Sequence, residues 1–174
     1  PVCCGKKQYP VFLGPDDLYD KVDAVSIAVP TPQHYPVARE FLLREIHVLL
    51  EKPIASTVWE AKKLIELAQT RNLTLQVGHL ERFNPALTAL GHTLINPRFI
   101  ESHRLQSFIE RSLDVDVIMD LMIHDIDIIL SLVKSDVKEV RAAGVPVISP
   151  HIDIANARIA FNNGCVANIT ASRI

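Results

Sequence analysis

The stretch Val22-Asp23-Ala24-Val25-Ser26-Ile27-Ala28-Val29, followed by Pro30-Thr31-Pro32, decides the fold of this 174-residue chain. Its apolar residues are largely β-branched and do not alternate with polar ones, which is typical of a parallel strand buried on both faces. Proline ends such a strand because it has no N–H to donate to the ladder. We therefore expect a buried strand over residues 22–29 and a loop at Pro30.

Helices and strands alternate after this strand. The residues expected to form them are helix 34–44, strand 46–50, helix 57–72 and strand 73–77. Thr57 and Glu60 have the spacing of a capping box, which opens the second helix, and strand 46–50 is again apolar enough to be buried on both faces. The order β-α-β-α-β with short loops requires a parallel sheet with right-handed crossovers. That arrangement is one half of a doubly wound nucleotide-binding fold.

A different pattern begins at Pro85. The expected elements are helix 85–94, strand 99–105, helix 115–133 and strands 137–147, 154–161 and 165–172. Asn163-Gly164 is a strong hairpin signal, and the alternation over residues 154–161 predicts a sheet with one solvated face. We expect an α/β chain: the second half of a Rossmann-like parallel sheet over residues 1–84, then an α+β domain with a largely antiparallel sheet over residues 85–174.

The composition excludes several classes of protein. Hydrophobic residues make up 48% of the chain, charged residues 22%, and the net charge is −2, so neither a disordered chain nor a nucleic-acid partner is expected. No apolar run reaches the roughly 18 residues of a membrane-spanning helix, and a membrane is not expected either. Cys3, Cys4 and Cys165 form no CxxC motif and no signal peptide is recognisable, which predicts free thiols and a cytoplasmic location.

Ligands of open parallel sheets bind beyond the carboxyl ends of the strands. Three polar segments occupy those positions: Pro30–His34, Glu51–Pro53 and Gly78–Arg82. Lys52 is either a group held in a dry cleft for proton transfer or a solvated loop residue. His34 by itself is more typical of a first helical turn than of a ligand, and Arg82 is either a clamp for a substrate anion or a salt-bridged rim residue.

The apolar helix expected over residues 115–133 carries Asp120, His124 and Asp127 on one stripe. A carboxylate one turn from an imidazole can orient the ring as a general base. Two other interpretations are an internal hydrogen-bond network that joins the two domains and a metal site on Asp120 and His124. Asp125 lies on another face of the helix, where we expect it to be solvated or to cap locally.

These residues resemble the glucose–fructose oxidoreductase/inositol dehydrogenase (Gfo/Idh/MocA) family. The matching segments, in the family's order and spacing, are residues 24–34 (AVSIAVPTPQH), 47–53 (HVLLEKP), 76–79 (QVGH), 82–85 (RFNP) and 120–127 (DLMIHDID). The chain departs from the family at Arg44-Glu45, where glycine is frequent, and at Arg111–Asp116, ahead of the helix. Together, segments 78–85 and 111–114 resemble members that are UDP-N-acetylglucosamine 3-dehydrogenases.

The resemblance implies an NAD(P)-dependent oxidoreductase acting on a secondary alcohol of a sugar, cyclitol or nucleotide sugar. It places Lys52, Asp120 and His124 at the hydride-transfer site, with His124 as the base, and Arg82 near the substrate together with Asp120 and His124. The residues implied to lie along NAD or NADP are Ala28, Val29, Pro30, Thr31, His34, Glu51, Lys52 and Pro53. The family's sheet also implies a homo-oligomer, either a dimer or a tetramer. No metal is implied.

Two further expectations concern the extent and the class of the protein. None of the six glycines forms the G-x-G-x-x-G turn that binds the pyrophosphate. We therefore expect a chain truncated at both ends that by itself binds a dinucleotide poorly. A non-catalytic relative that binds a sugar or cofactor as a sensor or partner remains the alternative function, although such a protein has no need to keep Lys52, Asp120 and His124 together. A metal-dependent hydrolase is the third interpretation.

Overall fold

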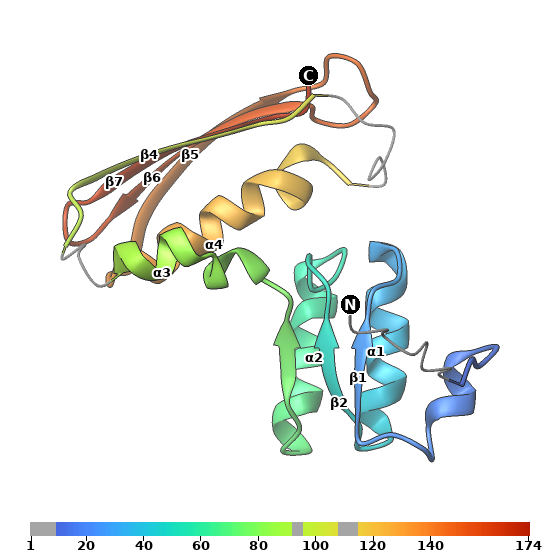
Figure 1. Cartoon of the computed structure of the whole chain (residues 1–174). Coiled ribbons are helices and arrows are strands. Elements are labelled where there is room, and N and C mark those ends of the chain that lie inside the picture. The colour runs from blue at the N-terminus through green and yellow to red at the C-terminus, as the bar shows by residue number, and fades with distance from the viewer. Residues whose placement is uncertain (1–9, 92–95, 108–114) are drawn as a thin grey trace, which may run out of the picture.

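The computed structural model describes residues 10–91, 96–107 and 115–174, which form two units, each built on its own sheet (Figure 1). The first sheet is parallel, in the order β1-β2-β3. Its strands are β1 (Ala24–Ile27), β2 (His47–Leu50) and β3 (Leu75–Val77), connected by the helices α1 (His34–Leu43) and α2 (Val58–Thr70). This confirms the predicted β-α-β-α-β order.

One face of the first sheet is exposed, which corrects the expectation of strands buried on both faces. In β2, Val48 and Leu50 are buried whereas His47 and Leu49 are exposed. The helices α1 and α2 lie together on one face (Figure 1), and the buried side chains pack against them. In the described part of the chain, the apolar strand β2 is therefore covered by helices on one face only, although its sequence does not alternate between apolar and polar residues.

The capping box at the start of α2 is present as predicted. The Glu60 N–H donates to the Thr57 hydroxyl oxygen at 3.2 Å, and the Thr57 N–H donates to the Glu60 carboxylate at 3.0 Å. These two bonds satisfy N–H groups that the first helical turn leaves without a partner. The helix starts where the sequence requires it.

The second sheet is mixed, in the order β4-β7-β6-β5. Its strands are β4 (Phe99–Leu105), β5 (Val137–Val145), β6 (Ile154–Phe161) and β7 (Val166–Ser172). The pairs β5–β6 and β6–β7 are antiparallel, whereas β4 pairs with β7 in parallel. Gly164 adopts φ +86° in the β6–β7 hairpin, as the Asn-Gly signal predicted.

A helix crosses the inner face of this sheet, between the sheet and the first unit (Figure 1). The single helix predicted over residues 115–133 begins at Ile118, with a π-helical turn (η4, Ile118–Met122) followed by α4 (Ile123–Leu132). Its buried residues, including Met122 and Ile129, share one apolar core with the inward side chains of β6 and β7. The predicted start was three residues too early, because apolar character does not distinguish a helix from the chain leading into it.

Several shorter elements complete the described chain. They are η1 (Pro15–Leu18), η2 (Thr31–Gln33), η3 (Leu80–Phe83) and α3 (Pro85–Gly91). The strand expected to reach residue 147 ends at Val145. The predictions for Cys3, Cys4, residues 92–94 and residues 111–114 lie outside the described residues.

Cys165 is a free, buried thiol, and its burial raises its pKa. Within residues 10–91, 96–107 and 115–174, no helix has both the length and the apolarity needed to cross a membrane.

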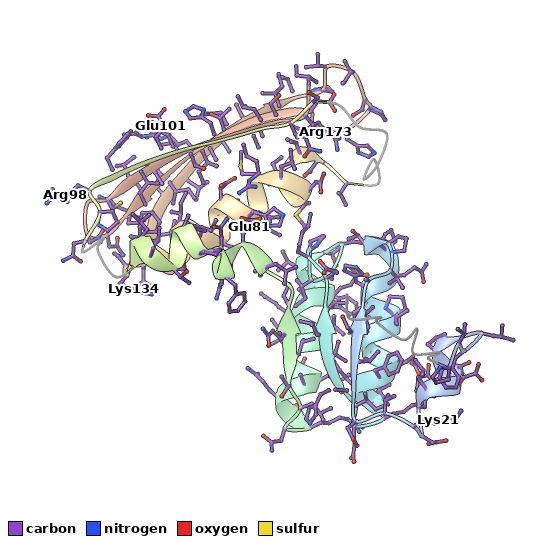
Figure 2. The ribbon with its side chains drawn as sticks, in the orientation of Figure 1. Lys21, Glu81, Arg98, Glu101, Lys134 and Arg173 are labelled. Carbon is purple, nitrogen blue, oxygen red and sulfur yellow. The ribbon has the colours of Figure 1, made fainter. Side chains whose placement is uncertain are left out.

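A buried polar cluster fixes the start of the π-helical turn. Arg173, labelled in Figure 2, donates from Nε to the carboxylate of the fully buried Asp153 at 3.0 Å and from Nη1 to the Val115 carbonyl at 2.9 Å. The Val117 N–H donates to the Ile152 carbonyl at 2.9 Å. The sheet thereby sets where the helix that carries Asp120 and His124 begins.

Candidate active site

A cleft of about 560 Å³ lies where the loops after β1 and β2 meet the start of the helix. Its wall in the first unit consists of Ala28, Val29, Pro30, Thr31, His34, Glu51, Lys52 and Pro53. Its other wall consists of Val115, Met119 and Asp120. The structure thus brings all eight positions assigned to the cofactor into one cleft, because the carboxyl ends of parallel strands meet at the same sheet edge.

Lys52 and Asp120 close this cleft across the two units. The Lys52 Nζ donates to the Asp120 backbone carbonyl at 2.8 Å and to the Asp120 Oδ1 at 3.0 Å. Both side chains are about one-fifth exposed, so the pair remains accessible from the cleft. An ammonium carries three N–H groups, and Asp120 takes two of them. Lys52 is therefore a positioned cation with a third N–H group that no other described residue occupies.

His124 follows Asp120 on the same stripe and makes no hydrogen bond to it among the described residues. Its Nδ1 is buried and has no hydrogen-bond partner within the described ranges. Burial lowers the pKa of the imidazole, and the nearby cations Lys52 and Arg104 lower it further. A ring kept neutral in this way is suited to accept a proton at neutral pH. Asp120 orients Lys52 rather than His124.

Asp127, the third residue of the stripe, holds Arg82. Arg82 donates from Nε to the Asp127 Oδ2 at 2.6 Å and from Nη2 to the Oδ1, and the carboxylate raises the pKa of the guanidinium. His79 lies alongside: its buried Nδ1 is 4.0 Å from the Asp127 Oδ1 and has no hydrogen-bond partner in the part of the chain that the structure describes. The structure shows that Arg82 is salt-bridged, and about half of its side chain remains exposed.

The stripe therefore joins the two units, as one of the sequence interpretations expected. Asp120 binds Lys52 and Asp127 binds Arg82, and both cations belong to the segment before Pro85. His124 lies between the two carboxylates along the helix. No group of three His, Cys, Asp or Glu side chains within the described ranges could hold a metal ion.

The prediction for Asp125 was wrong. It was expected to be solvated or to cap the helix, yet it is buried and binds Arg104 of β4 through two hydrogen bonds. The sequence offered no clear signal for this pair: Arg104 is an inward position of β4 in the structure, whereas the apolar Phe99 and Leu105 lie on the opposite, exposed face. Arg104 is thus a charged residue of the site that the motif-based interpretation missed.

His34 is fully buried in the cleft wall. Its Nδ1 lies 2.6 Å from the Pro53 carbonyl oxygen and its Nε2 lies 2.8 Å from the Val29 carbonyl oxygen. Both ring nitrogens therefore face backbone acceptors from the loops that follow β1 and β2. The ring joins these two loops, which form the cofactor side of the cleft.

Two family models match this chain in its two halves. Residues 2–79 match "Oxidoreductase family, NAD-binding Rossmann fold", and residues 92–174 match "GFO/IDH/MocA C-terminal domain". The two matches agree with the two units of the structure, one parallel sheet and one mixed sheet. Together they span most of the chain.

Individual relatives agree with the family models. The chain is 45% identical to UDP-N-acetylglucosamine 3-dehydrogenase of Acidithiobacillus ferrooxidans, over 94% of this chain and 52% of the relative. A solved structure of that enzyme, GnnA, superposes with a TM-score of 0.88 over 94% of this chain and 54% of the enzyme. An inositol 2-dehydrogenase of Rubrobacter xylanophilus is 30% identical over 72% of this chain and 38% of the relative.

The chain spans about half the length of the 3-dehydrogenase that it matches. Within that span, the similarity covers both sheets and the helix that carries Asp120 and His124. By its sequence and its fold, the chain belongs to the Gfo/Idh/MocA oxidoreductase family.

Proposed function

We propose that this chain carries the catalytic centre of an NAD(P)-dependent dehydrogenase that oxidises a secondary alcohol of a sugar, cyclitol or nucleotide sugar. The observation that carries the proposal is the Lys52–Asp120 pair, which closes a cleft lined by all eight expected cofactor positions. His124 on the same helix supplies a buried ring for proton transfer. The division into a dinucleotide-binding unit over residues 1–84 and a substrate unit over residues 85–174 belongs to the same proposal.

His124 is the base of the proposed reaction. Oxidation of a secondary alcohol removes a hydride from carbon and a proton from oxygen, so the hydroxyl needs a positioned acceptor. Burial and the neighbouring cations lower the pKa of His124, which keeps the ring in the form that can take this proton. The electron pair left on oxygen then forms the carbonyl as the hydride departs.

Lys52 stabilises the charge that develops on the substrate oxygen. Two of its N–H groups are held by Asp120, so the direction of the third is fixed before the substrate arrives. Preorganised donors of this kind stabilise a transition state without reorganising during the reaction. Asp120 is therefore the residue that positions the lysine.

The residues around the cleft fit a dinucleotide. When bound, the nicotinamide ring of NAD or NADP accepts the hydride. Ala28 to Thr31 would lie along the cofactor, and Glu51 and Pro53 would shape its nicotinamide side. His34 would support the wall by holding its two loops, since both ring nitrogens already face carbonyl oxygens.

We propose a nucleotide sugar of the UDP-N-acetylglucosamine type as the substrate. The 45% identity with UDP-N-acetylglucosamine 3-dehydrogenase supports it. Arg82 would contribute from the rim: Asp127 occupies its Nε and Nη2, while about half of the side chain remains open to a ligand.

We also propose that the protein is a cytoplasmic homo-oligomer. The outer face of the second sheet supports the self-association. Phe99 and Leu105 of β4 are exposed on this face, and Figure 2 shows Glu101 of the same strand on the side away from α4. Size-exclusion chromatography with light scattering tests the assembly. A monomer at micromolar concentration would refute it.

The central experiment compares Lys52→Ala and His124→Ala with the surface variant Lys63→Ala, all in the protein produced from its complete coding sequence. Among the residues that the structure describes, Lys63 forms its ion pair with Glu66, on the exposed side of α2. We expect both site variants to keep their circular dichroism spectrum and to lose turnover with NAD or NADP and a UDP-sugar, whereas Lys63→Ala keeps it. Full turnover in both site variants would refute the assignment.

Thermal-shift screening against NAD, NADP and a panel of UDP-sugars identifies the ligands, because binding to the folded state raises the melting temperature.

A further inference from the structure

His79 is an imidazole at the junction of the two units, and the mechanism above does not use it. It follows β3 after one residue and directly precedes η3, which packs against α4. Figure 2 shows Glu81 of η3 beneath that helix. The preceding residue borders the cleft wall, because a Cβ added to Gly78 would lie 3.4 Å from the Glu51 Oε1. His79 therefore lies at the sheet edge where the loop after β2 forms the cleft.

The two nitrogens of this ring have different surroundings. The Nδ1 is buried, lies 4.0 Å from the Asp127 Oδ1 and has no hydrogen-bond partner among the described residues. The Nε2 has no partner among them either, but it is not one of the buried atoms, and the side chain is 23% exposed. One nitrogen thus faces a carboxylate of α4, and the other is open to a ligand.

Asp127 determines which nitrogen carries the proton of the neutral ring. An ionised carboxylate only accepts hydrogen bonds, so the N–H that faces it belongs on Nδ1, and Nε2 is left as an acceptor. Arg82 holds the same carboxylate from Nε at 2.6 Å and from Nη2, which fixes its direction and balances its charge without a second proton on His79. The 4.0 Å separation exceeds a hydrogen bond, and contacts of this kind shorten in many enzymes once the substrate binds.

The open nitrogen of His79 lies near the proposed base. Asp127 follows His124 by three positions, and side chains with this spacing are neighbours on one face of a helix. A ring that faces Asp127 from the end of β3 is therefore about one helical turn away from His124. His124 has the same arrangement, since its Nδ1 is buried without a partner in the described chain and its Nε2 is not one of the buried atoms.

We propose that His79 determines substrate specificity: its Nε2 accepts a hydrogen bond from a hydroxyl group of the substrate other than the one that is oxidised. The proposal rests on the proposed function, because sugars and cyclitols carry several hydroxyl groups on neighbouring carbons. His124 takes the proton of the oxidised hydroxyl, whereas His79 receives a hydrogen bond and no proton. Two contacts of this kind fix which carbon of the substrate faces the nicotinamide.

The first test replaces the acceptor in the protein produced from its complete coding sequence, with UDP-N-acetylglucosamine as the probe. His79→Phe keeps a ring and removes both nitrogens, so kcat/KM should fall by about 3- to 10-fold, mostly through KM, the usual loss for one neutral hydrogen bond. His79→Gln offers an amide oxygen as the acceptor and should recover part of the loss. The matched control His103→Phe lies on the outer face of β4, where the side chain is 54% exposed, and should keep the wild-type kcat/KM.

Deoxy analogues distinguish substrate recognition from a structural role. In the wild type, either the 4-deoxy or the 6-deoxy analogue of UDP-N-acetylglucosamine should lose kcat/KM by a similar factor, because it lacks the hydroxyl that donates to Nε2. In His79→Phe the same analogue should lose nothing further, and in His79→Gln part of the loss should return. A structural role would lower kcat/KM equally for all three sugars. Unchanged losses for both analogues in His79→Phe would therefore overturn the inference.

The tautomer of His79 provides a readout that does not depend on activity. Heteronuclear NMR of the histidine rings, with the His79 signal assigned by its absence in His79→Phe, should show the proton on Nδ1 in the wild type. Asp127→Asn should change the balance of the two tautomers. A wild-type proton on Nε2 would overturn the inference, because that nitrogen would then donate.

The same experiments separate the inference from the proposed function. If the wild type does not turn over UDP-N-acetylglucosamine with NAD or NADP, the proposed substrate is wrong, and the inference about His79 fails with it. If the wild type is active but the deoxy analogues or the tautomer contradict the expectation, the proposed function stands and only the inference about His79 is overturned.

Discussion

Lys52 and Asp120 lie 68 positions apart in the chain, yet the Lys52 Nζ donates to both the carbonyl oxygen and the carboxylate of Asp120, at 2.8 and 3.0 Å. This double contact joins the loop after a parallel strand to a helix that packs on a different sheet. The residues of the proposed cofactor wall and those of the proposed catalytic helix meet at this contact.

Lys52→Ala should lower kcat by about 10²–10³-fold, the usual loss for one preorganised donor at a developing oxyanion. Asp120→Asn should lose less, because the Asp120 carbonyl still accepts a hydrogen bond from the lysine. Steady-state kinetics of both variants, with circular dichroism as the fold control, checks the order. A larger loss in Asp120→Asn than in Lys52→Ala would show that the carboxylate acts independently of the lysine.

The pH profile of kcat/KM should have its acid limb below 6.5, the ordinary pKa of histidine. Burial, Lys52 and Arg104 all lower the pKa of His124. The base acts unprotonated, so activity is present at neutral pH and is lost as the pH falls through this lowered pKa. His124→Gln should cost about 10²–10⁴-fold and abolish the limb. An unchanged limb in His124→Gln would assign it to another group.

The Arg82–Asp127 pair should contribute to stability across the two units. Arg82→Gln leaves the mostly buried Asp127 without its cation, and we expect a loss of about 1–2 kcal/mol in the free energy of unfolding. This is less than a fully buried pair costs because Arg82 is half-exposed. Urea denaturation of Arg82→Gln, Asp127→Asn and the double variant gives the coupling energy. Additive effects would show that the two side chains do not cooperate.

Asp153 should make the protein sensitive to acid. Burial alone would raise the pKa of this carboxyl, but hydrogen bonds from the Ser149 hydroxyl and the N–H groups of residues 147–149 hold it well below its usual range. Its stabilisation is therefore complete above the pKa of the unfolded chain and is lost as the pH falls through the folded pKa. Asp153→Asn should lower the urea midpoint at pH 7 and reduce the difference between pH 7 and about pH 3, which lies below the ordinary aspartate pKa of about 3.9. Ser149→Ala, which removes one donor, should have a smaller effect, and equal pH dependence in wild type and Asp153→Asn would contradict the prediction.

Glu45→Gly should stabilise the protein by about 0.5–1 kcal/mol. Glu45 has φ +62° after the end of α1, a left-handed conformation that costs a residue with a side chain about 1–2 kcal/mol and glycine almost nothing. The family frequently has glycine in this turn, which the conformation explains. Asn72→Gly, at φ +54°, is the control and should gain less because asparagine tolerates this region. Thermal denaturation measures both variants, and a lower melting temperature for Glu45→Gly would contradict the argument.

Local patterns predicted the elements well where a short-range interaction decides them. The Thr57–Glu60 capping box and the Asn163-Gly164 turn depend on neighbours a few residues away, and both occur as expected. The apolar runs at residues 22–29 and 46–50 correctly predicted strands but incorrectly predicted burial on both faces, because burial depends on which other elements cover the sheet. The start of the helix at Ile118 was missed for a related reason, since contacts from Arg173 and Ile152 set it.

The sequence by itself determined the class of fold, the two-part organisation and the three stripe residues Asp120, His124 and Asp127, because periodicity and motif spacing are properties of the local chain. Only the tertiary structure decided the partner of each charge: Lys52 for Asp120, Arg82 for Asp127 and Arg104 for Asp125. A buried carboxylate must find a cation to offset its desolvation, but nothing in the sequence specifies which one. That choice depends on how the helix lies between the two sheets.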